Sequence, residues 1–146
     1  MNQIAFYKMS GSGNDFIIID NRNRVVVENN LQNFIARVCR RKISVGADGL
    51  ILVEKSENVD FKWRFFNSDG SSAEMCGNGA RCAARFAYLN EISGTKVSFE
   101  TEAGVVSAQV KNDEVKIKMP DPIDLKIDYN LELENGLKQV CSVNTG

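Results

Sequence analysis

The sequence predicts an α+β fold in which a curved, mostly antiparallel sheet wraps around a central buried helix. The helix that begins near residue 80 is apolar nearly all round, which is typical of a helix buried on every side. After Gly94 the pattern becomes all-β, with short strands separated by turns. A single apolar stripe over residues 31–39 predicts one further helix, amphipathic and on the surface.

Length and composition fit one domain spanning residues 1–146. A chain of 146 residues can bury a sizeable core, and its 43% apolar and 25% charged residues are ordinary for a globular protein. The net charge of -1 gives no electrostatic reason to expect nucleic acid or a membrane surface as a partner. No apolar run approaches the roughly 18 residues of a membrane span, and a signal-peptide pattern is missing. We therefore expect a cytoplasmic protein.

The cysteine and histidine content limits the metal sites and the catalytic bases that the chain can provide. The chain has four cysteines and no histidine, and no two cysteines have the C-x-x-C spacing of a zinc site. We expect free thiols in a reducing compartment and no bound metal. Without histidine, neither Ser-His-Asp nor Cys-His catalysis is available within the chain, so a general base has to be Cys, Asp, Glu, Lys or Tyr.

The first predicted element is a hairpin with a polar tip. Residues 4–9 read as a short strand, residues 10–15 as a glycine-rich turn and residues 16–20 as a strongly apolar strand. Asn14 lies in the expected turn, where asparagine tolerates a left-handed backbone conformation. The spacing leaves open whether Asn14 is only a turn residue or also contacts a ligand.

The surface helix follows a polar connection. Its apolar residues fall at i, i+3, i+4, i+7 and i+8: Leu31, Phe34, Ile35, Val38 and Cys39. Asn29 or Asn30 can cap its start, and the basic residues 40–42 complement the dipole at its end. Cys39 lies on the apolar stripe, which favours a buried thiol with a packing role.

Two strands come next, over residues 50–54 and 60–67, and the glycine-punctuated turn 44–49 precedes them. The second strand alternates aromatic and basic side chains, which predicts one face in the core and one at least partly wet. The aromatic face carries Phe61, Trp63 and Phe65, and the basic face Lys62 and Arg64.

The C-terminal third is expected to be a series of strands. They cover residues 96–101, 105–111, 115–119, 125–133 and 137–143. The segment 120–122, Pro-Asp-Pro, breaks the ladder after the third of these strands. The last two pair across Asn135-Gly136, which is a hairpin signal.

Cys76 lies between the strand ending at Asn67 and the buried helix. It is the residue of this sequence that most strongly indicates a chemical function. A cysteine at or near a helix N-terminus meets backbone N–H groups that have no partner in the helix, and these favour a thiolate. The same groups could hold a ligand carboxylate or phosphate. Gly77 permits close backbone approach and Asn78 offers an amide beside it.

Blander interpretations of this stretch stay open. Cys76 could be an inert small residue at a helix start. Arg81 and Arg85, four residues apart, would most simply form a solvated or salt-bridged stripe on the helix. A redox pair of Cys76 and Cys82 is disfavoured, because six residues along a helix place the two side chains on different faces.

Four ordered motifs carry a family resemblance. They are Lys8-Met9-x-Gly11-x-Gly13-Asn14-Asp15-Phe16, Gly46-Ala47-Asp48-Gly49-Leu50, Phe66-Asn67-x-Asp69-Gly70-Ser71 and Met75-Cys76-Gly77-Asn78-Gly79-x-Arg81-Cys82. With them the chain resembles the diaminopimelate epimerases, the cofactor-independent amino-acid epimerases of lysine and cell-wall precursor synthesis. Proline racemases look similar near the cysteine, but a histidine usually replaces Asn78 there.

The resemblance implies a fold of two similar domains, each a curved sheet around a central helix, and a two-base mechanism without cofactor or metal. Two cysteines flank the α-carbon of a small amino-acid substrate, and Cys76 matches the first of them. Asn14, Asn67, Gly77 and Asn78 match substrate-contacting positions. At residue 49, where some members carry a substrate-contacting Gln, this chain has Gly, so only a backbone role could be carried over.

The resemblance also implies a missing partner. The second family cysteine belongs to a C-terminal domain, and Cys141 is no substitute, since it lies in a strand pattern without a glycine-rich helix start. The chain is therefore expected to be an N-terminal half that is inactive alone. The alternatives are a non-catalytic binding module that forms a homodimer through a bare apolar face, and a thiol or redox protein using Cys76 and Cys82.

Overall fold

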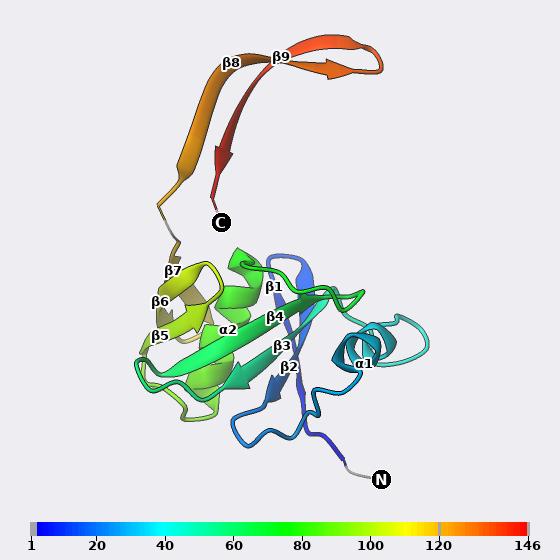
Figure 1. Cartoon of the computed structure of the whole chain (residues 1–146). Helices are drawn as coiled ribbons and strands as arrows, with labels where there is room; N and C mark the ends of the chain where they lie inside the picture. Colours follow the sequence, from blue (N-terminus) through cyan, green and yellow to red (C-terminus); the bar gives the residue numbers. More distant parts are fainter. Residues whose placement is uncertain (1–2, 120, 146) are drawn as a thin grey trace.

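In the computed structural model, which describes residues 3–119 and 121–145, a seven-stranded sheet curls around the long helix α2 (Figure 1). The strands follow one another in the sheet in the order of the sequence, β1 to β7. Four of the six strand pairs are antiparallel, while β2 and β3, and β4 and β5, run parallel. The predicted fold class is confirmed.

The N-terminal hairpin is shifted along the chain relative to the prediction. β1 covers Tyr7–Gly11 and β2 covers Asn14–Asp20, so residues 4–6 precede the strand. Ser12 and Gly13 alone form the turn, with φ of 50° and 94°, as in the tight turns that suit the twist of a hairpin. The expected turn over residues 10–15 is therefore too long, and Asn14 begins a strand with no left-handed backbone.

The register of three neighbouring strands brings together the strand ends that carry predicted site residues. β3 covers Gly49–Glu54 and β4 covers Phe61–Asn67. Phe16 of β2 pairs with Gly49, and Gly49 pairs with Asn67. The start of β2, the start of β3 and the end of β4 therefore meet at one end of the sheet. The predicted alternation in β4 is confirmed, with Trp63 buried and Lys62 exposed.

Helix α2 covers Gly77–Leu89 and fills the concave side of the sheet (Figure 1). Its alanines let the strands approach closely, and four of them have no exposed surface: Ala80, Ala83, Ala84 and Ala87. Around them pack the large aromatic side chains of β2, β4 and β5. The predicted central buried helix is confirmed.

Helix α1 covers Leu31–Val38 and packs on the other side of β2 and β3. Ile35 is fully buried there and Cys39 is 3% exposed, as predicted. The expected cap is only half right: Asn30 holds the N-cap position with a left-handed φ of 67°, but its side chain makes no capping hydrogen bond. Arg41, predicted to complement the helix dipole, instead pairs with the carboxylates of Asp15 in β2 and of Asp48 in the turn before β3.

The remaining strands divide into two groups. β5 (Lys96–Thr101), β6 (Gly104–Lys111) and β7 (Glu114–Lys118) complete the large sheet, while β8 (Ile123–Leu133) and β9 (Gly136–Asn144) form a hairpin of their own. In Figure 1 this hairpin extends away from the rest of the molecule. Pro120 lies outside the described residues. The assignment of residues 1–146 to one domain stays a prediction.

Among the described residues, none of the helices has the length and apolar character that crossing a membrane requires.

Candidate active site

The candidate site lies where the N-terminus of α2 meets the end of the sheet formed by Asn14, Gly49 and Asn67. Cys76 occupies the N-cap position of α2 with an extended backbone, φ -149° and ψ 112°. Its Sγ accepts a hydrogen bond from the backbone N–H of Gly79 at 3.4 Å. The predicted position of Cys76 at the helix start is thus observed, with the sulfur aimed at the unpartnered N–H groups.

The side chains of Asn78 and Asn14, 64 residues apart in the sequence, are in direct contact. Nδ2 of Asn78 donates to Oδ1 of Asn14 at 2.9 Å. Nδ2 of Asn14 donates in turn to a carboxylate oxygen of Asp48 at 3.1 Å. Cys76, Gly77, Asn78 and Asn14 are therefore neighbours, and each is partly exposed, as a ligand site requires.

Asn67 is at the same end of the sheet but is not part of this network. Its Nδ2 donates to the hydroxyl of Ser71, 3.0 Å away in the following turn, and the residue is exposed. The register with Gly49 is what relates Asn67 to the other predicted site residues.

Two glycines of the site differ in what surrounds them. A Cβ added at Gly49 would lie 2.6 Å from the carbonyl oxygen of Phe66 and 2.7 Å from the ring of Phe65, so packing requires glycine there. At Gly77 the nearest atoms would be 3.7 Å away, on Arg81 and Met119, which is an ordinary contact distance. Packing within the described chain does not explain why residue 77 is glycine.

A cluster of charged groups supports the turn that carries Asp48. Arg41 bridges the carboxylates of Asp15 and Asp48, and Lys8 also contacts Asp15 at 3.1 Å. The guanidinium of Arg41 is the main cause that holds the pKa of Asp15 well below its usual range. Hydrogen bonds from Asn14 first, and then from Arg41, lower the pKa of Asp48. Asp48 therefore stays ionised at neutral pH.

Sequence reasoning missed the part played by Asp48, Arg41 and Arg81. Nη1 of Arg81 donates to the carbonyl of Gly77 at 3.2 Å and to Oδ1 of Asn78 at 3.3 Å, so it belongs to the site and not to a solvated stripe. The interpretation of a salt-bridged side chain holds for Arg85, which pairs with Asp113. Asp48 stood within a quoted motif, but its partner Asn14 belongs to a distant strand.

The other thiols have different surroundings. Cys39 and Cys82 are buried, and burial raises the pKa of each to about 11. Cys141 is exposed on β9. All four cysteines are free. Among the residues that the structure describes, no group of three or more His, Cys, Asp or Glu side chains could hold a metal ion.

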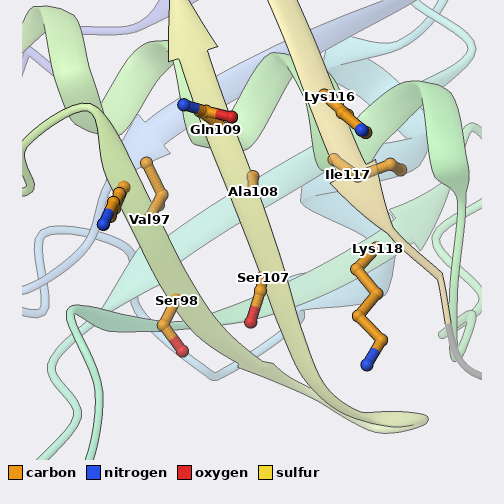
Figure 2. Close-up of a pocket in the computed structure, with 9 residues that line it drawn as sticks. Val97, Ser98, Ser107, Ala108, Gln109, Lys116, Ile117 and Lys118 are labelled. Carbon is orange, nitrogen blue, oxygen red and sulfur yellow. The ribbon is translucent and has the colours of Figure 1, made fainter.

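A cavity of about 650 Å³ lies apart from this site, on strands β5 to β7 (Figure 2). Small side chains such as Ser107 and Ala108 stand between Val97 on one side and the lysines of β7 on the other. None of the predicted site residues lines this cavity.

Solved structures share this fold. A probable proline racemase from Agrobacterium radiobacter K84 superposes with a TM-score of 0.72 and 13% identity, over 97% of this chain and 49% of that chain. A hydroxyproline epimerase from Agrobacterium vitis gives a TM-score of 0.71 and 13% identity, over 94% and 48%. At this identity the likeness defines the fold class, a curved sheet wrapped around a helix, and no more.

Sequence comparison gives the family. The sequence model described as diaminopimelate epimerase matches residues 6–123, and the chain belongs to that family. The diaminopimelate epimerase of Aquifex aeolicus is 52% identical over 80% of this chain and 44% of its own length. That of Hydrogenobaculum is 44% identical over 95% of this chain and 53% of its own length. The chain thus spans about half the length of these relatives.

Proposed function

We propose that this chain is one half of a cofactor-independent epimerase that interconverts LL- and meso-diaminopimelate, and that Cys76 supplies one of its two proton-transferring groups. Family membership supports the reaction class. The observation that carries the assignment of Cys76 is its place at the start of α2, with Sγ 3.4 Å from the N–H of Gly79 and beside the joined amides of Asn78 and Asn14.

The proposed chemistry is a proton transfer on each face of the substrate. The Cys76 thiolate takes the α-proton, so the C–H bond breaks, an S–H bond forms, and the electron pair stays on the α-carbon and its carboxylate. A second thiol on the opposite face then returns a proton. In the reverse reaction the two sulfurs exchange roles.

The backbone N–H groups at the helix N-terminus can assist the most difficult step of this reaction, removal of the α-proton. A carboxylate resists further negative charge, so the α-proton of an amino acid is very weakly acidic. Backbone donors fixed in advance near the carboxylate stabilise the charge as it develops. Gly77, where packing leaves room for a side chain that is not there, supports close approach of the substrate to this backbone. Asn14, Asn67 and Asn78 are the proposed side-chain contacts.

The second thiol is proposed to come from a C-terminal half. Cys141 lies exposed in the middle of β9, far in sequence from any helix start among the described residues. The hairpin β8–β9 exposes large apolar side chains that would pack against such a half. They are Ile123, Leu125, Ile127, Leu131, Leu133, Leu137 and Val143. The chain alone is accordingly expected to be inactive.

A hybrid protein tests the proposal. The chain is joined to the C-terminal half of the Aquifex aeolicus relative, and both the chain alone and the hybrid are purified from a host without its own epimerase. We expect no interconversion by the chain alone and measurable interconversion by the hybrid. Cys76→Ser in the hybrid should lower kcat by about 10²–10⁴-fold, the usual worth of a positioned acid or base.

Cys39→Ser is the matched control, because it changes a buried thiol in the packing of α1. The proposal is wrong if the hybrid folds and lacks activity, if Cys76→Ser leaves its activity unchanged, or if the isolated chain turns over at the hybrid's rate.

Self-association is a second candidate function, favoured by the same exposed hairpin. A second copy would then cover the apolar residues of β8 and β9 in a homodimer. Light scattering on the chain alone separates the two outcomes: a monomer at micromolar concentration excludes this alternative, and a dimer that Leu125→Ser dissociates supports it.

A further inference from the structure

A line of hydrogen bonds runs across the candidate site from a cation to an anion. Arg81 donates to Asn78, Asn78 donates to Asn14, and Asn14 donates to Asp48, over distances of 3.3, 2.9 and 3.1 Å. The line joins the N-terminal part of α2 to β2 and to the turn before β3. Each bond runs in the same direction, with the donor on the Arg81 side.

The two ends of the line determine how both asparagines are oriented. An asparagine amide has a donor nitrogen and an acceptor oxygen of nearly the same shape, and it can turn over unless its partners prevent it. An ionised carboxylate only accepts, so Asp48 requires the nitrogen of Asn14 on its side. A guanidinium only donates, so Arg81 requires the oxygen of Asn78 on its side. The bond between the two amides is then consistent only in the observed direction.

The two end residues are themselves held in place. Asp48 also accepts from the backbone N–H of Asp15 at 3.1 Å and from Arg41 at 2.8 Å. Arg81 also donates to the carbonyl of Gly77. Each asparagine nitrogen has two hydrogens, and among the described residues each uses one of them. A fixed orientation leaves one N–H of each amide for a ligand.

We propose that Asp48 and Arg81 are positioning residues that fix the side-chain amides of Asn14 and Asn78 from opposite ends, so that the site presents them to a ligand as oriented hydrogen-bond donors. This inference deepens the proposed function and rests on it only for the identity of the ligand. Neither residue has to touch the reacting atoms. Their effect is transmitted through the two amides.

Exchange of the side-chain NH₂ hydrogens with water tests this, measured by NMR on the ¹⁵N-labelled chain without substrate. Asp48→Ala removes the acceptor of the Asn14 amide, and we expect exchange at Asn14 to rise about tenfold, as for loss of a hydrogen bond to a charged group. Exchange at Asn78 should rise too, by about threefold, because its acceptor is released.

Asp15→Ala is the matched control. It deletes a carboxylate from the same charged cluster, but the carboxylate of Asp15 makes no hydrogen bond to either asparagine amide in the described structure. We expect exchange at Asn14 and Asn78 to change less than about twofold. An equal rise in both variants would overturn the proposal, because a general loosening of the turn would explain it.

Arg81→Met tests the line from the other end and serves if Asp48→Ala does not fold, which the dispersion of backbone amide signals shows directly. Exchange at Asn78 should rise severalfold. Unchanged exchange at Asn78 in a folded Arg81→Met, or at Asn14 in a folded Asp48→Ala, would also overturn the proposal. Since no substrate is present, an inactive hybrid enzyme would count against the proposed reaction and leave this result intact.

Discussion

The body of the molecule, β1 to β7 with the two helices, and the hairpin β8–β9 use similar alternating strands in opposite ways. In β6, Val106, Ala108 and Val110 are buried, while Ser107 and Gln109 between them are exposed. In β8, Leu125 and Ile127 stand at comparable alternate positions, yet they are 70% and 67% exposed. Helix α2 packs against β6, whereas no described helix packs against β8. Alternating apolar residues are enough to form a strand, but they become part of a core only where another element packs against them.

The body and the hairpin also differ in what stabilises them. Burial of apolar area stabilises the body at about 25 cal/mol per Å². The hairpin relies on its backbone ladder and on Tyr129 paired with Val140, its half-buried pair. An isolated two-stranded hairpin is marginal in water. Mutations of equal size should therefore differ widely in cost between the two regions.

The largest difference is expected between the effects of Trp63→Ala and Leu125→Ala on the free energy of unfolding. Trp63 is 1% exposed, and its ring centroid lies 5.6 Å from that of Phe65 and 5.6 Å from that of Phe99. Its truncation should lower the free energy of unfolding by about 3–5 kcal/mol. Urea unfolding followed by circular dichroism measures both variants. A loss of unfolding free energy below about 1 kcal/mol for Trp63→Ala would show that the core is not tightly packed around this side chain.

The second-largest difference between the two regions is expected in the rates at which their cysteines are modified. At pH 8 the thiolate fraction of Cys39 and Cys82 is on the order of 100-fold lower than for an ordinary thiol, because burial raises the pKa of each to about 11. Iodoacetamide should therefore modify exposed Cys141 well before Cys39 and Cys82, and the rates at Cys39 and Cys82 should climb with pH up to about 11. Mass spectrometry reads each site. Equal modification rates at Cys39, Cys82 and Cys141 would mean that the body opens as easily as the hairpin.

Gly49→Ala should have a smaller effect on stability. The new Cβ would lie 2.6 Å from the Phe66 carbonyl, and backbone cannot move aside as a flexible side chain can. We expect a loss of about 1–3 kcal/mol in thermal or urea unfolding. Gly94→Ala is the control, since nothing lies within 4 Å of its added Cβ. Indistinguishable variants would contradict the close approach of β3 to β4.

The smallest effect is expected for Leu125→Ser, within about 0.5 kcal/mol of the parent chain. Its side chain is 70% exposed, so little apolar burial is lost. Fluorescence of the single tryptophan during urea unfolding reports on the body alone. A loss comparable to that of Trp63→Ala would show that the hairpin is buried in solution, as in a dimer.

Several features of this protein are fixed by local sequence. The alanine-rich apolar run after residue 79 predicts a buried helix because only close neighbours on every side can use such a surface. The glycines around Cys76 and the apolar strand before it place that cysteine at the helix start. Local sequence does not set the ends of the elements: β1 begins three residues further along than predicted, because cross-strand pairing and not alternation sets its limits.

The tertiary structure alone decided how the site is assembled. Asn14, Asp48 and Asn78 belong to separate motifs, and only the parallel pairing of β2 with β3 and the packing of α2 inside the sheet bring their side chains into one line. Local patterns report burial and backbone conformation, which depend on near neighbours. Hydrogen-bond partners 34 and 64 residues apart depend on how the whole sheet closes around its helix.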